Sequence, residues 1–212
     1  MRSPSVAPSL SPIKTVIFTA FFQLSKRRHF RQGIFVTEAD TPWTELASRV
    51  VRVALTRKNF SYAELSTALH CIGVTESERS LASRVSRGRI KAQLLLQIFT
   101  VTHAKVSPQW QPTFATNLGW ERKVQEIIKL ELARHPTVTF EELAQRMVKL
   151  GAELTEKTLV SHLQLGTLSL PELLQCLVAL GSSSLELYID YDDMAAAAAM
   201  PKVARPHHQN TI

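Results

Sequence analysis

Cysteine is scarce in this sequence, which has only Cys71 and Cys176 among its 212 residues. The two cysteines lie at non-equivalent places in the apolar runs that contain them. They therefore indicate neither a disulfide framework nor a zinc site. A reducing interior is the expected environment, and we predict a cytoplasmic protein.

Groups that support catalysis are missing too. The sequence has seven glycines but no glycine-rich phosphate-binding loop, and its histidines occupy unrelated positions instead of metal-ligand spacings. His70 and Cys71 are adjacent, yet neighbours on a helix point about 100° apart, so they do not form a nucleophile and base pair. We predict no enzyme, no cofactor, no metal site and no small-molecule substrate.

Long apolar segments are also lacking. The longest run near the start of the chain, 16–24, is far too short to cross a bilayer. It follows Lys14, as the apolar region of a signal peptide follows a basic residue, but Lys26, Arg27 and Arg28 stand where a small-residue cleavage site is needed. We expect neither secretion nor a membrane partner.

What the sequence does have is a pattern of about sixty-five residues written twice, from Trp43 and again from Trp120. The offset is 77 residues as far as Pro136 and, after one inserted residue near that position, 78 residues. With this single gap many residues coincide, among them Leu55 with Leu132, Gly73 with Gly151, Glu78 with Glu156, Ser83 with Ser161, and Gly88 with Gly166. So many matches across one gap predict a tandem duplication.

The duplication divides the chain into five segments. The first repeat covers 43–104 and the second repeat covers 120–189, joined by a linker at 105–119 that is rich in turn-forming residues. Residues 1–42 hold scattered proline and serine and a basic cluster, which predicts a flexible extension. Residues 190–212 open with acidic residues and alanines, which predicts a disordered tail unable to bury a core. Each repeat is near the lower size limit for independent folding, so we expect it to rely on further contacts.

Hydrophobic spacing predicts that both repeats are helical. Leu46, Val50 and Val53 recur at intervals of three and four, which places one apolar stripe on a helix from about 44 to 58. The second repeat has the equivalent face between about 124 and 132, and no segment shows convincing strand alternation. The predicted fold class is all-α, with two tandem bundles of four to five short helices.

Capping residues predict the boundaries of the next helices. Ser61 and Glu64 have the spacing of a capping box, in which each side chain accepts a hydrogen bond from an exposed backbone N–H, and 139–142 repeats the device. A third helix is expected from near Ser77 to Gly88, because glycine can take the left-handed conformation that ends a helix. A fourth helix follows it in each repeat.

Net charge is +7, and its distribution is more informative than its sum. The extension has six basic and two acidic residues, for +4, and the first repeat has ten against four, for +6. The second repeat reverses this balance with seven against nine, for −2. A basic first half is expected of a protein that meets a polyanion, although a solvated surface explains bulk charge equally well.

The third helix of the first repeat is the candidate nucleic-acid site. The second and third helices, joined by a tight segment around Gly73, have the order of a helix-turn-helix, whose third helix enters the major groove. Leu81 and Val85 lie four apart and should face the core. Arginine forks can hold phosphates or contact guanine, and serine hydroxyls add short contacts. The predicted nucleic-acid-binding residues are Arg79, Ser80, Ser83, Arg84, Arg87, Arg89 and Lys91.

The second repeat keeps the folding residues of this helix and loses its charge. The core pair persists as Leu159 and Leu163, whereas Arg84 becomes His162 and Arg87 becomes Leu165. We expect Leu165, with Leu168 and Leu170 close by, to form an apolar patch that packs on another copy or subunit. Either a pseudo-dimer with one recognition helix or a homo-oligomer held by second repeats would result.

Five short segments of the first repeat together match a known pattern: Trp43, Ser61-Tyr62-Ala63-Glu64-Leu65, Ile72-Gly73, Ser86-Arg87-Gly88 and Leu96-Gln97. They resemble a bacterial domain-of-unknown-function family, family 6471, over about 65 residues of each repeat. The second repeat is similar through Leu174-Gln175-Cys176-Leu177 but departs from the pattern at Gln164-Leu165-Gly166. The family looks like the repressor-type helix-turn-helix fold, which implies DNA binding by analogy.

Two functions compete for this sequence. The basic third helix predicts a double-stranded DNA-binding, transcription-regulatory protein whose first repeat contacts DNA and whose second repeat assembles or stabilises. The alternative is a non-catalytic protein-interaction module in which the basic face is incidental, as Leu165 suggests. RNA is less well supported, because the chain lacks an aromatic platform on which single-stranded bases could stack.

Overall fold

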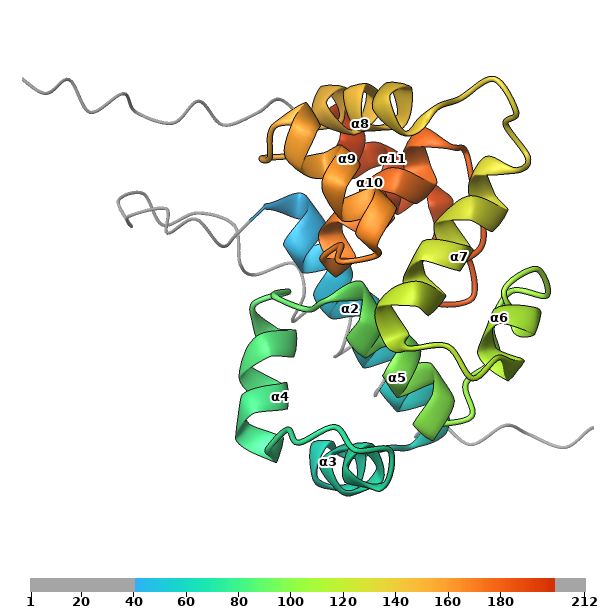
Figure 1. The fold of residues 1–212 in the computed structure, drawn as a ribbon. Coiled ribbons are helices and arrows are strands. Elements are labelled where there is room, and N and C mark those ends of the chain that lie inside the picture. Colours follow the sequence, from blue (N-terminus) through green and yellow to red (C-terminus); the bar gives the residue numbers. More distant parts are fainter. Residues whose placement is uncertain (1–40, 201–212) are drawn as a thin grey trace, which may run out of the picture. The chain divides into compact units, whose positions relative to one another are not determined.

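The structure, a computed structural model, describes residues 41–200. The predicted extension lies almost wholly outside the described residues, as does the end of the predicted tail from 201 onward. Within the described range the chain is all-α, as predicted, and has no strand. Its helices are α2 Pro42–Lys58, α3 Tyr62–Cys71, α4 Glu78–Ser86, α5 Ala92–Val101, α6 Gln111–Ala115, α7 Trp120–Leu132, α8 Phe140–Lys149, α9 Glu156–Leu165, α10 Leu170–Ala179 and α11 Tyr191–Ala199 (Figure 1).

The helix boundaries of the first repeat follow from its capping residues. Ser61 and Glu64 form the predicted capping box at the start of α3, with the Ser61 N–H donating to the Glu64 carboxylate over 2.8 Å. The hydroxyl of Ser77 accepts from the Ser80 N–H at the start of α4. The chain after α4 passes through Gly88 at φ +64°. These side chains satisfy backbone groups that a helix end leaves unpaired.

The second repeat uses equivalent devices. Thr139 and Thr155 accept backbone N–H groups at the starts of α8 and α9, and Ser169 with Glu172 forms a full capping box at α10. Gly166 ends α9 at φ +69°. The four main helices of each repeat therefore correspond one to one, and the predicted tandem duplication is a duplication of structure.

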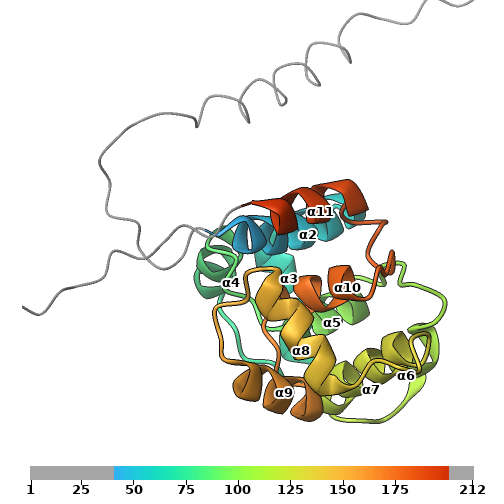
Figure 2. The same cartoon turned by 90° about the horizontal axis from the view of Figure 1, so that it is seen from above.

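The two repeats share one core. The first helix of each repeat packs mainly on the fourth helix of the other, so that α2 lies on α10 and α7 lies on α5 (Figures 1 and 2). Trp43 illustrates the exchange, because it is buried and its indole N–H donates to the carbonyl of Leu150 in the second repeat over 3.2 Å. The support that each small repeat needs comes from its neighbour in the same chain.

A pseudo-two-fold axis relates the repeats. Lys91 and Ser169, which are equivalent at the offset of 78, face each other in an isolated antiparallel bridge. Two hydrogen bonds flank it and exchange under the same offset, from Ala92 N to Leu168 O over 3.0 Å and from Leu170 N to Ile90 O over 2.7 Å. An antiparallel pair has local two-fold symmetry, so the axis passes between Lys91 and Ser169. The chain is a pseudo-dimer within one polypeptide.

The linker between the repeats is packed structure. Trp110 is fully buried, and its indole N–H donates to the carboxylate of Glu131 over 2.7 Å. Gln109 and Ser184 donate to the same carboxylate oxygen over 2.7 and 2.6 Å. Glu131 lies on α7 and is itself buried, so these hydrogen bonds replace the water that it loses. The linker is therefore held against the second repeat.

The prediction of a disordered tail from 190 is wrong for its first part. Residues 191–199 form α11, which packs on α2 and α10, and its Met194 is fully buried. An exposed ion pair between Arg49 and Asp193 joins α11 to α2. The alanines that suggested low complexity are strong helix formers with small side chains, and two acidic residues in the first turn suit the helix dipole.

Candidate nucleic-acid interface

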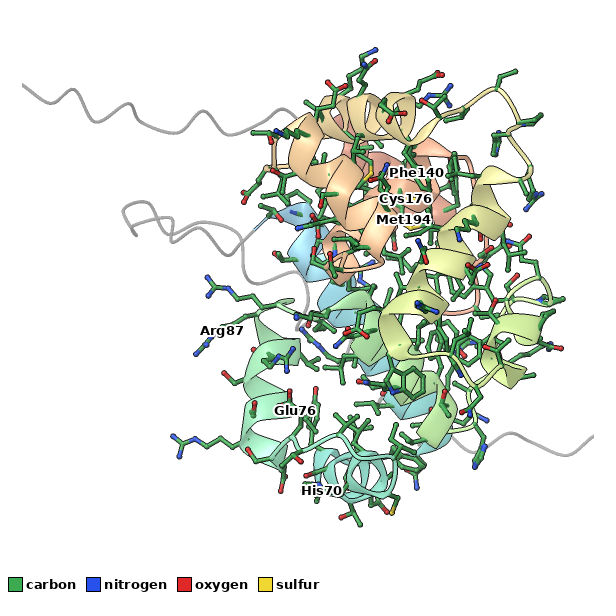
Figure 3. The ribbon with its side chains drawn as sticks, viewed as in Figure 1. His70, Glu76, Arg87, Phe140, Cys176 and Met194 are labelled. Atoms are coloured by element: carbon green, nitrogen blue, oxygen red, sulfur yellow. The ribbon has the colours of Figure 1, made fainter. Side chains whose placement is uncertain are left out.

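Helix α4 has the two-sided character that its sequence predicts. Leu81 and Val85 are fully buried and pack α4 against α2 and α3. Their burial turns the opposite face of α4 toward solvent. Arg87, at the C-terminal end of the helix, points away from the body of the molecule (Figure 3).

Four predicted binding residues are exposed cations, namely Arg79, Arg87, Arg89 and Lys91. None of the four has an ion-pair partner within residues 41–200. Their charges are therefore available to an anion, and guanidinium groups suit phosphate oxygens because they can donate two parallel hydrogen bonds. These residues lie on α4 or within five residues of its end, so they present their charge over a short surface.

Two other predicted binding residues are engaged inside the protein. Arg84 forms an ion pair with the Glu76 carboxylate, and the Ser80 hydroxyl donates to the same carboxylate over 2.9 Å. The side chains of Arg84 and Glu76 are only 31% and 21% exposed. Arg84 and Ser80 thus bind Glu76 in this structure and are not part of a free surface, a correction to the predicted set. Ser83 is half-buried.

Glu76 is the residue that the sequence interpretation missed. Besides its carboxylate contacts, its backbone carbonyl accepts the Ser66 hydroxyl over 2.6 Å, which ties α3 to the turn before α4 (Figure 3). A signal was present, because Glu76, Ser80 and Arg84 recur every four residues, the spacing at which helical side chains meet. The contact stabilises the placement of α4.

The connection between α3 and α4 is longer than expected. Helix α3 ends at Cys71 and α4 begins at Glu78, whereas a helix-turn-helix ordinarily has a turn of three or four residues. Gly73 turns the chain at φ +80°, and the Val74 N–H donates to the Leu69 carbonyl over 3.0 Å. The helix order is that of a helix-turn-helix, but the tight turn predicted around Gly73 is only the first part of the connection.

Close backbone contact holds the far end of α4. Gly88 lies against α2 so closely that an added Cβ would stand 2.0 Å from the carbonyl oxygen of Thr44. Gly166 repeats the contact in the second repeat, where a Cβ would stand 2.0 Å from the carbonyl oxygen of Glu121. Both third helices are therefore fixed in the same way against the first helix of their own repeat.

Helix α9 is the second-repeat counterpart of α4, and its surface is nearly neutral. The positions of the four exposed cations hold Lys157, Leu165, Thr167 and Ser169, so three of the four charges are lost. The counterpart of Arg84, His162, lies 2.9 Å from the Glu172 carboxylate. The charge difference between the repeats is thus concentrated on equivalent surfaces.

The predicted apolar patch of the second repeat does not form as expected. Leu165 is 62% exposed, but Leu168 and Leu170 are buried. Leu168 and Leu170 flank Ser169 at the pseudo-two-fold axis, where their backbone groups bond to the first repeat. They belong to the junction between repeats within the chain, and only Leu165 remains available to a partner.

Other kinds of site find no support in the described range. Residues 41–200 contain no group of three or more His, Cys, Asp or Glu side chains that could hold a metal ion. None of the helices in that range is long and apolar enough to cross a membrane. Burial, and next the Glu131 carboxylate, raise the pKa of the Cys176 thiol well above its ordinary value.

Comparison with known proteins identifies both repeats. The model of a family described as a domain of unknown function (DUF6471) matches residues 43–106 and, separately, residues 120–185. No curated protein matches the chain, and no solved structure matches it. The two matched ranges coincide with the repeats defined by their internal similarity.

Proposed function

We propose that this protein, which belongs to the DUF6471 family through both of its repeats, binds double-stranded DNA through α4 of the first repeat. Bound in this way it would act as a transcription regulator in the cytoplasm. The fold family has no established activity to transfer, so the proposal depends on the chemistry of the α4 surface.

One observation supports the proposal above the others. Four exposed cations without an ion-pair partner in the described range lie on or next to one short helix, and only one of them keeps its charge in the second repeat. A surface needed only for solubility has no reason to concentrate its charge on one of two equivalent helices. A phosphate backbone does need such a concentration, because each contact releases counterions and strengthens binding.

The order of the helices agrees with this assignment. Helix α3 supports α4 from behind, and the C-terminal end of α4 is held by the contact of Gly88 with Thr44. A recognition helix has to be rigid and accessible on one side, since a mobile helix would lose entropy on binding. Helix α4 meets both requirements.

The test is a salt series with the full-length protein and mixed-sequence duplex DNA, followed by fluorescence anisotropy. The logarithm of the binding constant should fall linearly with the logarithm of salt concentration, and Arg87→Ala should make the slope shallower by about 0.9. Arg87→Ala/Arg89→Ala should lower it by about 1.8, since each side chain contributes one phosphate contact.

Arg134→Ala is the matched control. Arg134 is also an exposed arginine, but it follows α7 and donates to the side chain of Gln109 in the linker. Its removal changes net charge by the same amount as Arg87→Ala and should leave the slope unchanged. No binding at low salt, or equal effects of the two substitutions, would contradict the proposal.

The second candidate function is protein interaction through the second repeat. The observation in its favour is Leu165, a large apolar side chain that is 62% exposed on a near-neutral helix. Such a module would bind no DNA and would self-associate or bind another protein. Sedimentation of the parent and of Leu165→Ser distinguishes it, because only an interface residue changes the assembly state.

A further inference from the structure

The pseudo-two-fold axis places the two third helices in equivalent positions. A rotation about an axis leaves the height along that axis unchanged, so α4 and α9 lie at the same end of the molecule. The figures agree, since both helices lie on the left side of the described chain while α6 lies on the right (Figures 1 and 2). A flat or gently curved partner that covers α4 at this end also faces α9.

The two helices end near the axis. Arg87 and Leu165, which cap or close them, each precede a bridge residue by four positions. Two stretches of four residues at no more than about 3.6 Å each, joined by a strand pair of about 4.5 Å, keep the Cα atoms of Arg87 and Leu165 within about 33 Å of each other. One turn of B-DNA is about 34 Å, so a duplex on α4 does not extend far before it meets α9.

We infer that the exposed face of α9 contacts the same DNA duplex as α4, in the adjoining half of the binding site. The inference depends on the proposed function and changes the role of the second repeat, which then contributes to binding in addition to stabilising the fold. The DNA site has two unequal halves, because the protein presents a basic helix to one and a near-neutral helix to the other.

The side chains of α9 suit contact with bases more than with phosphates. Lys157, Ser161, Gln164 and Leu165 are exposed on this helix, and only Lys157 is charged. A glutamine amide can pair with the edge of adenine, and an apolar group can pack on the methyl group of thymine. The α9 half therefore adds sequence preference and little dependence on salt, whereas the α4 half supplies the electrostatic attraction.

Restoring charge to α9 tests the inference by a gain of function. Leu165→Arg places an arginine at the position equivalent to Arg87, on a side chain that is 62% exposed and therefore tolerant of substitution. If α9 faces the duplex, the new arginine reaches a phosphate, and the slope of the logarithm of affinity against the logarithm of salt becomes steeper by about 0.9. Affinity at low salt rises accordingly.

Gln111→Arg is the matched control. Gln111 is exposed at the start of α6, away from α4 and α9, and its substitution adds the same charge (Figure 1). It should leave the slope unchanged, since exposed charges separated by more than about 10 Å are largely screened at 0.1 M salt. Circular dichroism and thermal melts confirm that both variants are folded like the parent.

The outcomes separate this inference from the proposed function. A steeper slope for Leu165→Arg alone supports the contact of α9 with DNA. A parent that binds DNA through Arg87, together with a Leu165→Arg variant that matches the parent or Gln111→Arg, overturns the inference and leaves the proposed function standing. A parent that binds no DNA overturns both.

Discussion

Gly88 lies against the backbone of Thr44, with no room between them for a Cβ atom. The same glycine has φ +64°, so it needs both the space and the left-handed conformation that glycine provides. Through this contact the C-terminal end of α4, with Arg87, is fixed to α2. Gly166 and Glu121 repeat the relationship in the second repeat.

Gly88→Ala should therefore destabilise the protein. The left-handed conformation costs alanine about 1 kcal/mol or more, and the overlap with the Thr44 carbonyl adds a backbone shift, for a loss of about 3 kcal/mol in total. Urea denaturation measures it. Gly73→Ala is the control, because Gly73 has φ +80° but nothing within 4 Å of the added Cβ. Equal losses at the two positions would show that the contact with Thr44 is unimportant.

Glu76→Gln should have opposite effects on stability and on DNA binding. The substitution weakens the pairing with Arg84, which costs about 1 kcal/mol of unfolding free energy, because the pair is partly shielded from solvent. It also releases Arg84 and removes a negative charge beside the exposed cations. If α4 contacts phosphate, affinity rises and the salt slope steepens by about 0.9.

Glu78→Gln is the comparison for this prediction. Glu78 lies in the first turn of α4, is exposed, and has no ion pair with another described residue. Its substitution removes the same charge without releasing an arginine, so the salt slope should change less than in Glu76→Gln. A weaker affinity for Glu76→Gln would show that Arg84 has to be held by Glu76 for binding.

Met194→Ala should reveal that α11 is part of the fold. Met194 is fully buried where α11 packs on α2 and α10, and its truncation leaves a cavity that costs about 2–5 kcal/mol. Met200 follows α11, is 59% exposed, and provides the same substitution with little effect. Thermal melts of both variants test the point, and a Met194→Ala protein as stable as its parent would show that α11 does not pack in solution.

The two cysteines should differ in reactivity. Cys71 is exposed on α3, whereas Cys176 is buried and the pKa of its thiol is raised by desolvation and by Glu131. Because the thiolate is the reactive form, a disulfide reagent should modify one cysteine per chain in the folded protein and two in urea. Labelling of Cys71→Ser in its folded state should be slow.

The raised pKa of Cys176 also predicts a dependence of stability on pH. A thiol with a higher pKa in the folded than in the unfolded state stabilises the protein fully below the unfolded pKa, near 8.5, and loses that contribution as the pH rises above it. The unfolding free energy should fall by up to about 1.4 kcal/mol for each pH unit in that range. In Cys176→Ala the decline should be smaller, and identical pH profiles would contradict the assignment.

Local features of the fold could be predicted from short stretches of sequence. The capping box of Ser61 and Glu64, the end of α4 at Gly88 and the buried pair of Leu81 and Val85 all depend on neighbours within a few residues. The side chain of a cap finds its partner three residues along the same helix, whatever the rest of the chain does. Such contacts are encoded where they occur.

The candidate site was predicted only in part, because charge alone does not reveal pairing. Arg79, Arg87, Arg89 and Lys91 are exposed as expected, whereas Arg84 is held by Glu76. The prediction treated Arg84 as solvent-facing from its position on the helix. The turn before α4 brings Glu76 back over that face, and a helical projection of α4 does not include the turn.

The sequence by itself determined the helices, their caps, the duplication and the unequal charge of its two copies, since each depends on spacing along the chain. The tertiary structure alone decided that α2 packs on α10 and α5 on α7, that Leu168 and Leu170 are buried at the pseudo-two-fold axis, and that α11 completes the core. The physical reason is that an apolar helix face specifies burial without specifying its partner. When two copies have similar faces, exchange between copies and packing within a copy fit the same pattern, and only the assembled chain shows which of them is adopted.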